Sequence, residues 1–185
     1  MSSWNLLGFH QNLIVADTVD EASAKLGAIL AAGPEVRTIM LLLNPRTDGF
    51  RPWLDAVKIA TPETRGLMVQ RFFAQVLIRA GYNVVIGREL DIFARSRLRS
   101  LLIEVKSSLA GGRFGSRAEI NQLDGYLIAS ERRRAERWLG TMGIENPILL
   151  RKNLRNQMRA RSIGHLSISW LSIRETLLPH ISSIL

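Results

Sequence analysis

Cysteine is absent from this chain of 185 residues. Its absence excludes a disulfide framework, a zinc site built on thiolates and nucleophilic thiol chemistry. The few histidines, His10, His165 and His180, are isolated and lack the spacing of metal ligands. Apolar runs such as residues 39–43 are too short to span a bilayer, and no basic stretch leads into a long apolar run at the N-terminus. We therefore expect a soluble, cytoplasmic protein that has no membrane partner.

Motifs of two large enzyme classes are missing as well. The glycine-rich segment 107–117 lacks the spacing of a loop that holds phosphates at the start of a helix, and no serine lies in a nucleophile elbow. No repeat or Pro/Gly/Ser-rich linker divides the chain, and its length suffices for one substantial core. We expect a core over residues 61–185, preceded by a strand–helix–strand extension of open role over residues 1–60.

Positive charge is abundant. The chain carries 25 Lys and Arg residues against 16 Asp and Glu, a net charge of +9, which favours a polyanionic partner such as nucleic acid. Arginine dominates, and its planar fork suits phosphate contacts. The residues that we expect to contact nucleic acid are Arg113, Arg117, Arg132, Arg133 and Arg134. An ordinary solvated surface, with segment 107–117 as a linker, is the alternative.

Two β-prone segments enclose a polar turn. Residues 90–94 and 101–106 are apolar, and residues 95–100 between them are polar, so the pattern predicts a hairpin. Asp91 lies near the start of the first strand and Glu104 near the end of the second. Antiparallel pairing can therefore bring these two carboxylates level.

Glu104 and Lys106 are two residues apart on the second strand of this hairpin. Side chains alternate along a strand, so both should point to one face while Ile103 and Val105 point to the core. The carboxylates of Asp91 and Glu104 suit Mg²⁺, with Mn²⁺ as a substitute, because Mg²⁺ binds one or two protein carboxylates beside water and phosphate oxygens. Two carboxylates and a lysine suit metal-dependent hydrolysis of a phosphodiester. In that reaction Lys106 can orient or deprotonate the attacking water, or offset charge in the transition state.

This order of residues resembles the PD-(D/E)xK nuclease superfamily, whose pattern is Asp, a spacer, then Glu or Asp, any residue, and Lys. Segments 81–85 and 88–92 are similar to the helix end, first strand and acidic turn of archaeal Holliday-junction resolvases and related bacterial members. The resemblance covers about residues 61–130. It implies a restriction-endonuclease-like α/β fold, in which helices flank a mixed central β-sheet with the hairpin at its centre. The residues that match the motif are Asp91, Glu104 and Lys106.

A helix is predicted immediately before the hairpin. Thr61 is a suitable N-cap, Pro62 fits the first helical position, and Gly81 ends the helix. In the family this helix often carries a glutamate that contributes to the metal site, and the matching position here is Gln70. Glu63 lies two turns earlier on the same face and is the other candidate, although a charge near the helix start is its ordinary role.

A second helix is predicted over residues 118–139. Gln122 and Tyr126 lie four residues apart, on one helical face, and are similar to the Gln-x-x-x-Tyr motif of RecB-like nucleases. That resemblance implies that both lie beside the catalytic centre and position water or the substrate strand. Ordinary packing is the alternative.

The ends of the chain predict further sheet and helix. Strands are expected at 12–16 and 36–43 around a helix at 17–32, which could extend the sheet or form a small lobe. Later segments predict a short strand at 148–150, a basic helix at 153–161 and a strand at 167–172.

The leading expectation is a Mg²⁺-dependent endo- or exonuclease acting on DNA. Asp91 and Glu104 would bind the metal, and Lys106 and Gln122 would act in catalysis. Two alternatives stay open: a catalytically impaired nuclease-fold protein that serves as a nucleic-acid-binding or assembly subunit, and an enzyme that cleaves RNA. A homodimer is a further expectation, because junction and duplex cutters commonly need paired sites.

Overall fold

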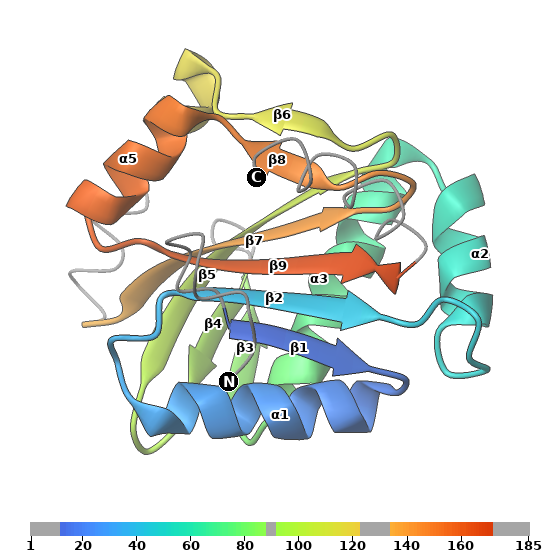
Figure 1. Ribbon diagram of the computed structural model, residues 1–185, viewed down its shortest axis with the longest axis horizontal. Helices are drawn as coiled ribbons and strands as arrows, with labels where there is room; N and C mark the ends of the chain where they lie inside the picture. Colours follow the sequence, from blue (N-terminus) through green and yellow to red (C-terminus); the bar gives the residue numbers. More distant parts are fainter. Residues whose placement is uncertain (1–11, 88–91, 123–133, 172–185) are drawn as a thin grey trace, which may run out of the picture.

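The computed structural model describes residues 12–87, 92–122 and 134–171, and a seven-stranded mixed sheet runs through it (Figure 1). The strand order is β1-β2-β9-β7-β5-β4-β3. β1, β2, β9, β7 and β5 are parallel, whereas β4 and β3 join antiparallel at one end. Helices flank this sheet, so the predicted α/β class is confirmed. The strands are β1 (Asn12–Ala16), β2 (Thr38–Leu43), β3 (Asn83–Ile86), β4 (Ile92–Arg95), β5 (Ser100–Ser108), β7 (Glu136–Gly143) and β9 (Gly164–Trp170).

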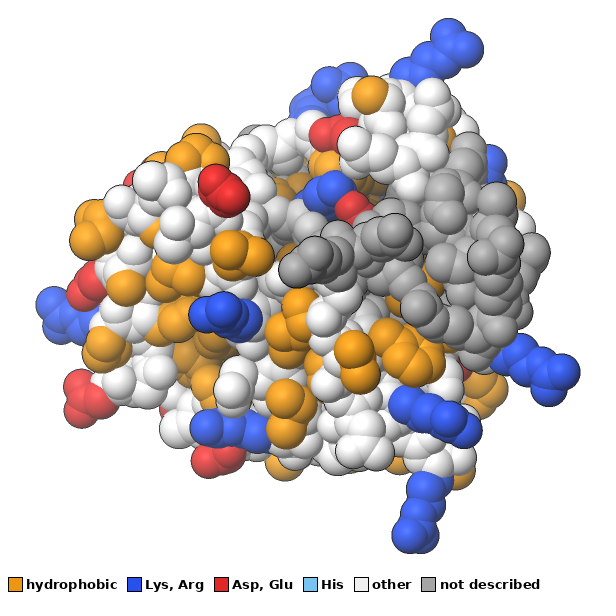
Figure 2. Space-filling model, turned by 180° about the vertical axis from the view of Figure 1, so that it is seen from behind, with side chains coloured by type: hydrophobic (Ala, Val, Ile, Leu, Met, Phe, Trp, Pro, Cys, Tyr) orange, Lys and Arg blue, Asp and Glu red, His pale blue; other side chains and the backbone are white. Residues whose placement is uncertain are grey.

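Three helices bury their apolar sides against one face of the sheet: α1 (Val19–Ala32), α2 (Arg51–Ile59) and α3 (Pro62–Arg79). The main core joins Leu26 of α1 and Phe73 of α3 to Ile103 of β5. The outer side of α3 keeps Leu67 and Ile78 exposed. Figure 2 shows the molecule from behind, where hydrophobic side chains lie among charged ones. No helix within the described ranges is long and apolar enough to cross a membrane.

The opposite face of the sheet is covered by α5 (Lys152–Ala160), by a helical segment over residues 117–122 and by a two-stranded ribbon. The ribbon pairs β6 (Gly112–Phe114) with β8 (Ile148–Leu150). A second apolar cluster forms here, in which Ile120, Leu139, Leu154 and Met158 pack together. The central part of the sheet is therefore buried on both faces, as parallel sheets usually are, whereas Leu13 and Val15 of β1 are exposed.

The signals for helix ends in the first half of the chain are confirmed. Thr18 caps α1 by accepting a hydrogen bond from the Glu21 amide at 3.1 Å, and Thr61 caps α3 in the same way. Gly81 follows the end of α3 with φ of 95°, a conformation that favours glycine. The strand–helix–strand predicted before residue 60 extends the sheet, because β2 pairs with β9.

The prediction of a helix over residues 118–139 is wrong at its end. The described helix begins at Arg117, and residues 136–139 open strand β7. The neighbours Trp138 and Leu139 are buried in the two different apolar clusters, on opposite faces of the sheet. Only a strand turns consecutive side chains to opposite faces, so burial on both sides determines a strand at residues 136–139.

Two smaller expectations also change. The hairpin β4–β5 lies toward one end of the sheet, because β7 is the middle strand. The glycine-rich segment 107–117 is partly β-sheet, since it contains the end of β5 and all of β6. Gly111 has φ of 72°, and a Cβ there would lie 2.4 Å from the Asn146 carbonyl oxygen. Gly111 therefore allows the backbone before β6 to lie close to the backbone of Asn146.

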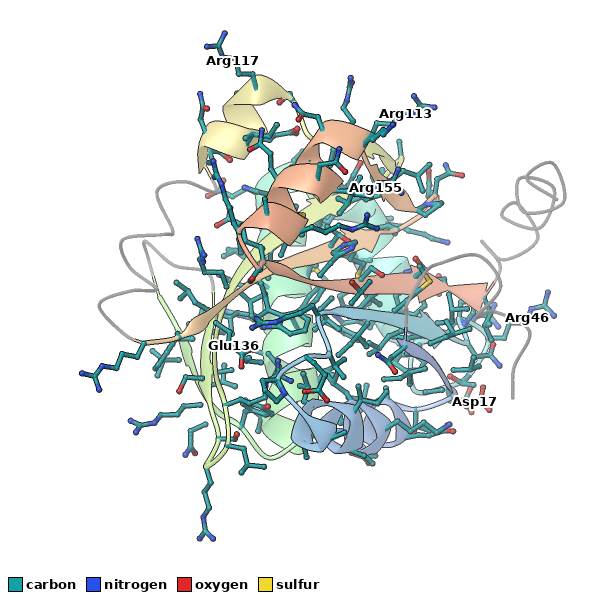
Figure 3. The ribbon with its side chains drawn as sticks, turned by 60° about the vertical axis from the view of Figure 1, so that its left-hand side comes forward. Asp17, Arg46, Arg113, Arg117, Glu136 and Arg155 are labelled. Carbon is teal, nitrogen blue, oxygen red and sulfur yellow. The ribbon has the colours of Figure 1, made fainter. Side chains whose placement is uncertain are left out.

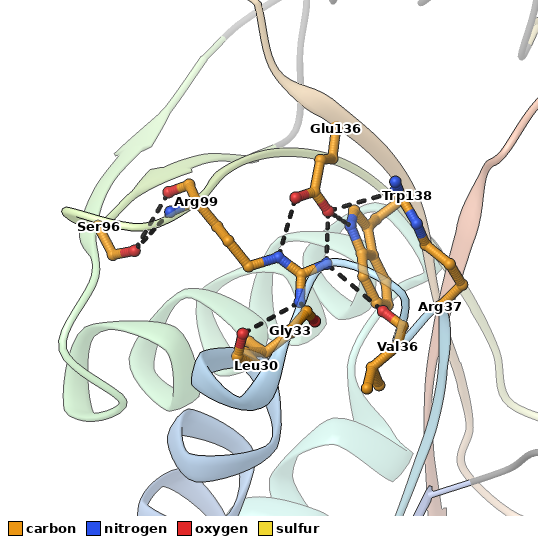
Figure 4. A network of polar contacts seen from close by, with 8 residues as sticks. All are labelled: Leu30, Gly33, Val36, Arg37, Ser96, Arg99, Glu136 and Trp138. Carbon is orange, nitrogen blue, oxygen red and sulfur yellow. Dashed lines mark hydrogen bonds and ion pairs between the residues drawn. The ribbon is translucent and has the colours of Figure 1, made fainter.

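A buried ionic network holds the start of β5 (Figure 4). Arg99 is 6% exposed, and its Nε and Nη2 donate to the Glu136 carboxylate at 2.9 and 2.5 Å. Its Nη1 donates to the carbonyl oxygens of Leu30 and Gly33 at 3.1 and 3.0 Å. Arg37 adds a second cation 3.2 Å from Glu136. The turn before β5, the start of β7 and the end of α1 are thereby joined.

The Glu136 carboxylate stays ionised in this network. Burial raises its pKa, but the hydrogen bonds from Arg99 and Trp138 and the charges of Arg99 and Arg37 outweigh burial and lower the pKa below its ordinary value. The network therefore anchors the strand that carries the candidate site.

Candidate active site on strand β5

Strand β5 turns Glu104 and Lys106 away from the main core. Ile103 is buried in that core and Val105 packs against it. Glu104 pairs in register with Leu139, which belongs to the second cluster on the other face. The predicted alternation along this strand is confirmed, and the charged pair lies on the side of α5 and the helical segment 117–122.

The Glu104 carboxylate is almost fully buried. The residue is 5% exposed, and its Oε1 lies 2.5 Å from the Lys106 Nζ. Its Oε2 is buried and has no hydrogen-bond partner within the described ranges. An unsatisfied buried carboxylate oxygen is costly, and in native proteins such atoms commonly face an ion, a water or a reacting group. Oε2 is also the hard oxygen donor that Mg²⁺ prefers, so this residue fits a metal ligand.

Lys106 lies between two oxygen acceptors. Besides the Glu104 contact, its Nζ donates to the Gln122 Oε1 at 3.3 Å. Its side chain is 30% exposed, so the ammonium group reaches solvent while its stem is covered. The structure thus brings Glu104, Lys106 and Gln122 together; the catalytic role of each stays a prediction.

The helical segment that carries Gln122 is held by a capping box. The Glu119 Oε2 accepts from the amides of Gly115 and Ser116 at 2.7 and 2.6 Å, and the Ser116 Oγ accepts from the Glu119 amide at 3.3 Å. Burial raises the pKa of Glu119, but these hydrogen bonds and the charge of Lys106 outweigh burial and lower the pKa. Glu119 was missed in the sequence, although Ser-x-x-Glu spacing marks a helix start.

Several predicted site residues lie outside the described ranges: Asp91, Tyr126, Arg132 and Arg133. Next to Asp91 in the sequence, Ile92 of β4 pairs with Ile103 of β5. The sequence places Asp91 directly before Ile92, and Glu104 directly after Ile103. The part that Asp91 takes in metal binding stays a prediction.

Gln70 and Glu63 lie on α3. Gln70 is buried, whereas Glu63 is exposed in the first turn of the helix. α3 packs on the sheet face that carries Ile103, and Glu104 points to the opposite face. Across the described part of the chain, no three His, Cys, Asp or Glu side chains converge on a common point. A contribution of α3 to the metal site stays a prediction.

The predicted nucleic-acid contacts that the structure describes are all exposed. Arg113 lies on β6, Arg117 begins the helical segment, and Arg134 precedes β7. Figure 3 shows Arg113, Arg117 and Arg155 at the end of the molecule that holds α5 and β6, whereas Arg46 lies near Asp17 on another side. Arg113, Arg117 and Arg155 thus lie on elements that cover the sheet face of Glu104.

A cavity of about 1010 Å³ lies beneath this basic end and was not predicted from the sequence. Thr141, His165 and Ser167 line it from strands β7 and β9. The His165 Nε2 lies 2.8 Å from the Thr141 Oγ1, and burial lowers the pKa of His165 to about 4. His165 is therefore neutral at pH 7, and the cavity floor is a row of uncharged polar groups.

Comparisons of the chain with protein-family models, with curated proteins and with solved structures gave no match.

Proposed function

We propose that the protein is a Mg²⁺-dependent nuclease that hydrolyses phosphodiester bonds in DNA, on a restriction-endonuclease-like core of the PD-(D/E)xK type. The observation that carries this proposal is the buried Glu104 carboxylate, which is paired with Lys106 through one oxygen and has no partner at the other among the residues that the structure describes. A purely structural ion pair would gain more from satisfying both oxygens, because a half-satisfied buried carboxylate destabilises the fold.

The roles follow from the contacts. Glu104, together with Asp91, would hold the cation, which when bound acts as a Lewis acid and lowers the pKa of water. Lys106 can donate a hydrogen bond to the attacking water, and its charge offsets the negative charge that develops on the phosphate oxygens. Gln122 accepts a hydrogen bond from Lys106 and so limits the direction in which the ammonium group points.

Location and partner are part of the same proposal. The net charge of +9 favours a polyanion, and a chain without cysteine gains nothing from an oxidising compartment, so we place the enzyme in the cytoplasm with DNA as its partner. A homodimer would supply the paired sites that cutting both strands of a duplex requires.

A second candidate function rests on Gln70. The buried neutral side chain stands where related nucleases often carry a glutamate, which favours a catalytically impaired nuclease-fold protein that binds nucleic acid. Mg²⁺-dependent cleavage by the parent protein separates the two candidates. Gln70→Glu tests whether α3, which packs on the sheet face opposite to Glu104, contributes to the metal site, because a carboxylate that reaches the cation should tighten Mn²⁺ binding in calorimetry. Unchanged or weaker binding would place Gln70 outside the metal site and leave Glu63 as the candidate on α3.

The decisive experiment measures Mg²⁺-dependent cleavage of labelled DNA and of RNA with the same sequence. Glu104→Gln and Lys106→Met should each lower cleavage by about 100-fold or more, since the first removes the charge that would hold the cation and the second the charge that acts on the phosphate. The matched control is Glu145→Gln, because Glu145 is an exposed glutamate two residues after β7. Equal cleavage by all three variants would reject the site. Faster cleavage of RNA would retain the site and change the substrate.

A further inference from the structure

The cavity of about 1010 Å³ lies on the same sheet face as the candidate active site. In register, Lys106 on β5 pairs with Thr141 on β7, and Thr141 pairs with Ser167 on β9. Thr141 and Ser167 both line the cavity. Neighbouring strands lie about 4.8 Å apart, so the cavity floor begins one strand from Lys106 and Ser167 lies about 10 Å across the sheet from it.

The described lining of this basic cavity carries an excess of positive charge. No Asp or Glu is among the described lining residues. Arg37 pairs with Glu136 outside the cavity lining, whereas the other lining cations form no ion pair with any described carboxylate. The cations are Arg37 from the connection before β2, Arg113 from β6, and Arg151, Lys152, Arg155 and Arg159 from α5 and its start.

The same lining indicates what part of a ligand is recognised. No Phe, Tyr or Trp is among the described lining residues, so the cavity lacks the stacking platforms on which proteins bind nucleic-acid bases. Arginine forks and the hydroxyls of Ser167 and Ser169 are hydrogen-bond donors that suit phosphate oxygens. Apolar side chains such as Met40, Leu149 and Met158 also line the cavity, but its six cations, without a described carboxylate or aromatic ring, favour a phosphate backbone over a free base.

We propose that the basic cavity binds the phosphates of a single nucleic-acid strand, without regard to sequence, and leads that strand to Lys106. Binding of the strand rests on the cavity alone, whereas the claim that the strand leads to Lys106 rests on the proposed nuclease function. The volume fits a short run of nucleotides, since it is about the upper limit of small-molecule sites. The row from Ser167 through Thr141 to Lys106 connects the bound strand with the Glu104 carboxylate.

The test measures binding in EDTA, where cleavage plays no part. Fluorescence anisotropy follows a labelled oligothymidylate of about 12 nucleotides, a length within the site sizes of single-strand binders. The variant is Arg155→Gln with Arg159→Gln, both exposed on α5, and the control is Arg46→Gln with Arg51→Gln, both exposed and outside the cavity lining. Circular dichroism and Tm confirm that each double variant is folded.

The cavity variant should bind the strand about tenfold more weakly per arginine, because each loses a charged hydrogen bond. The slope of log affinity against log salt should become shallower by about 1.4, or 0.7 for each lost phosphate contact. The control should retain the parent affinity and slope. Equal affinities of the cavity variant and the control would overturn the proposal.

Competitors identify the source of the phosphate. Inorganic phosphate, at the same total phosphate concentration, should displace the strand poorly; displacement as efficient as by unlabelled oligonucleotide would reduce the cavity to a small-anion site and overturn the strand proposal. Duplex of equal length should be insensitive to the cavity variant, and equal sensitivity would also overturn it. Strand binding that depends on the cavity, without Mg²⁺-dependent cleavage by the parent protein, would reject the nuclease and retain the inference.

Discussion

Replacement of Glu104 by glutamine should separate stability from metal binding in this protein. The side chain is 7% exposed, and its Oε2 has no partner within the described ranges. Glutamine keeps the shape and removes the charge. In the absence of metal the variant should therefore be the more stable protein, although it has lost the carboxylate on which the proposed chemistry depends.

The magnitude follows from two opposing contributions. A buried polar atom left without a partner destabilises a fold by about 1 to 3 kcal/mol, and a carboxylate oxygen lies toward the upper end. The ion pair with the partly exposed Lys106 returns at most about 1 kcal/mol. The metal-free variant should gain about 1 kcal/mol, which raises Tm by roughly 2 to 4 °C in a chain of this length.

Divalent cations should reverse the order of stability. At a hundred times its dissociation constant, a bound ion stabilises the native state by about 2.7 kcal/mol. The parent should then gain roughly 5 to 10 °C in Tm with Mn²⁺ or Mg²⁺. Glu104→Gln should gain less than half of that increase, because a formal charge has been removed from the site.

The assay is thermal unfolding in EDTA and across a series of cation concentrations, with Glu145→Gln as the control. The exposed Glu145 should change stability by less than about 0.5 kcal/mol and leave the metal response intact. A loss of more than about 2 kcal/mol in metal-free Glu104→Gln would show that the pair with Lys106 is a structural anchor. An unchanged response to cations would show that Glu104 is no metal ligand.

Three further predictions concern other parts of the structure. Arg99→Met should lower the free energy of unfolding by about 3 kcal/mol in urea denaturation, because it leaves a buried carboxylate short of a partner, whereas the exposed Arg97→Met should be nearly neutral. For His165, whose folded pKa of about 4 lies below the ordinary 6.5, the unfolded chain binds more protons below pH 6.5, so stability should fall as pH drops from about 6.5 toward 4. Because the residue is partly exposed, the free energy of unfolding should fall by about 1 to 2 kcal/mol between pH 7.5 and pH 5. Urea unfolding at the two pH values should show that His165→Gln lacks this fall. An equal fall in the variant would show that His165 is not its cause. Gln122→Ala should lower kcat for DNA cleavage by about tenfold and leave strand binding in EDTA unchanged, since it acts by positioning Lys106; a matching loss of binding would point to a substrate contact instead.

Local patterns in the sequence predict the elements whose signals are carried by neighbouring residues. The caps at Thr18 and Thr61 were predictable because each joins a side-chain oxygen to the amide only three residues later. Glu104 and Lys106 share a face because strand periodicity is also local, whatever the strand packs against. The hairpin β4–β5 and its charged face could therefore be predicted without knowledge of the fold.

Tertiary structure decided the features that depend on which elements pack together. Residues 136–139 were predicted to end a helix but begin β7, because Trp138 and Leu139 pack in apolar clusters on different faces of the sheet. The pairing of Arg99 with Glu136 spans 37 residues and has no local signal.

The same holds for the site and the basic cavity. Tertiary packing leaves the Oε2 of Glu104 buried and without a partner within the described ranges, and sequence spacing says nothing of which polar atoms such packing leaves unsatisfied. The basic cavity gathers residues from Arg37 to Ser169, whose proximity arises only when β9 inserts between β2 and β7. Periodicity determines the face to which a side chain points, but strand order determines which distant side chains it meets there.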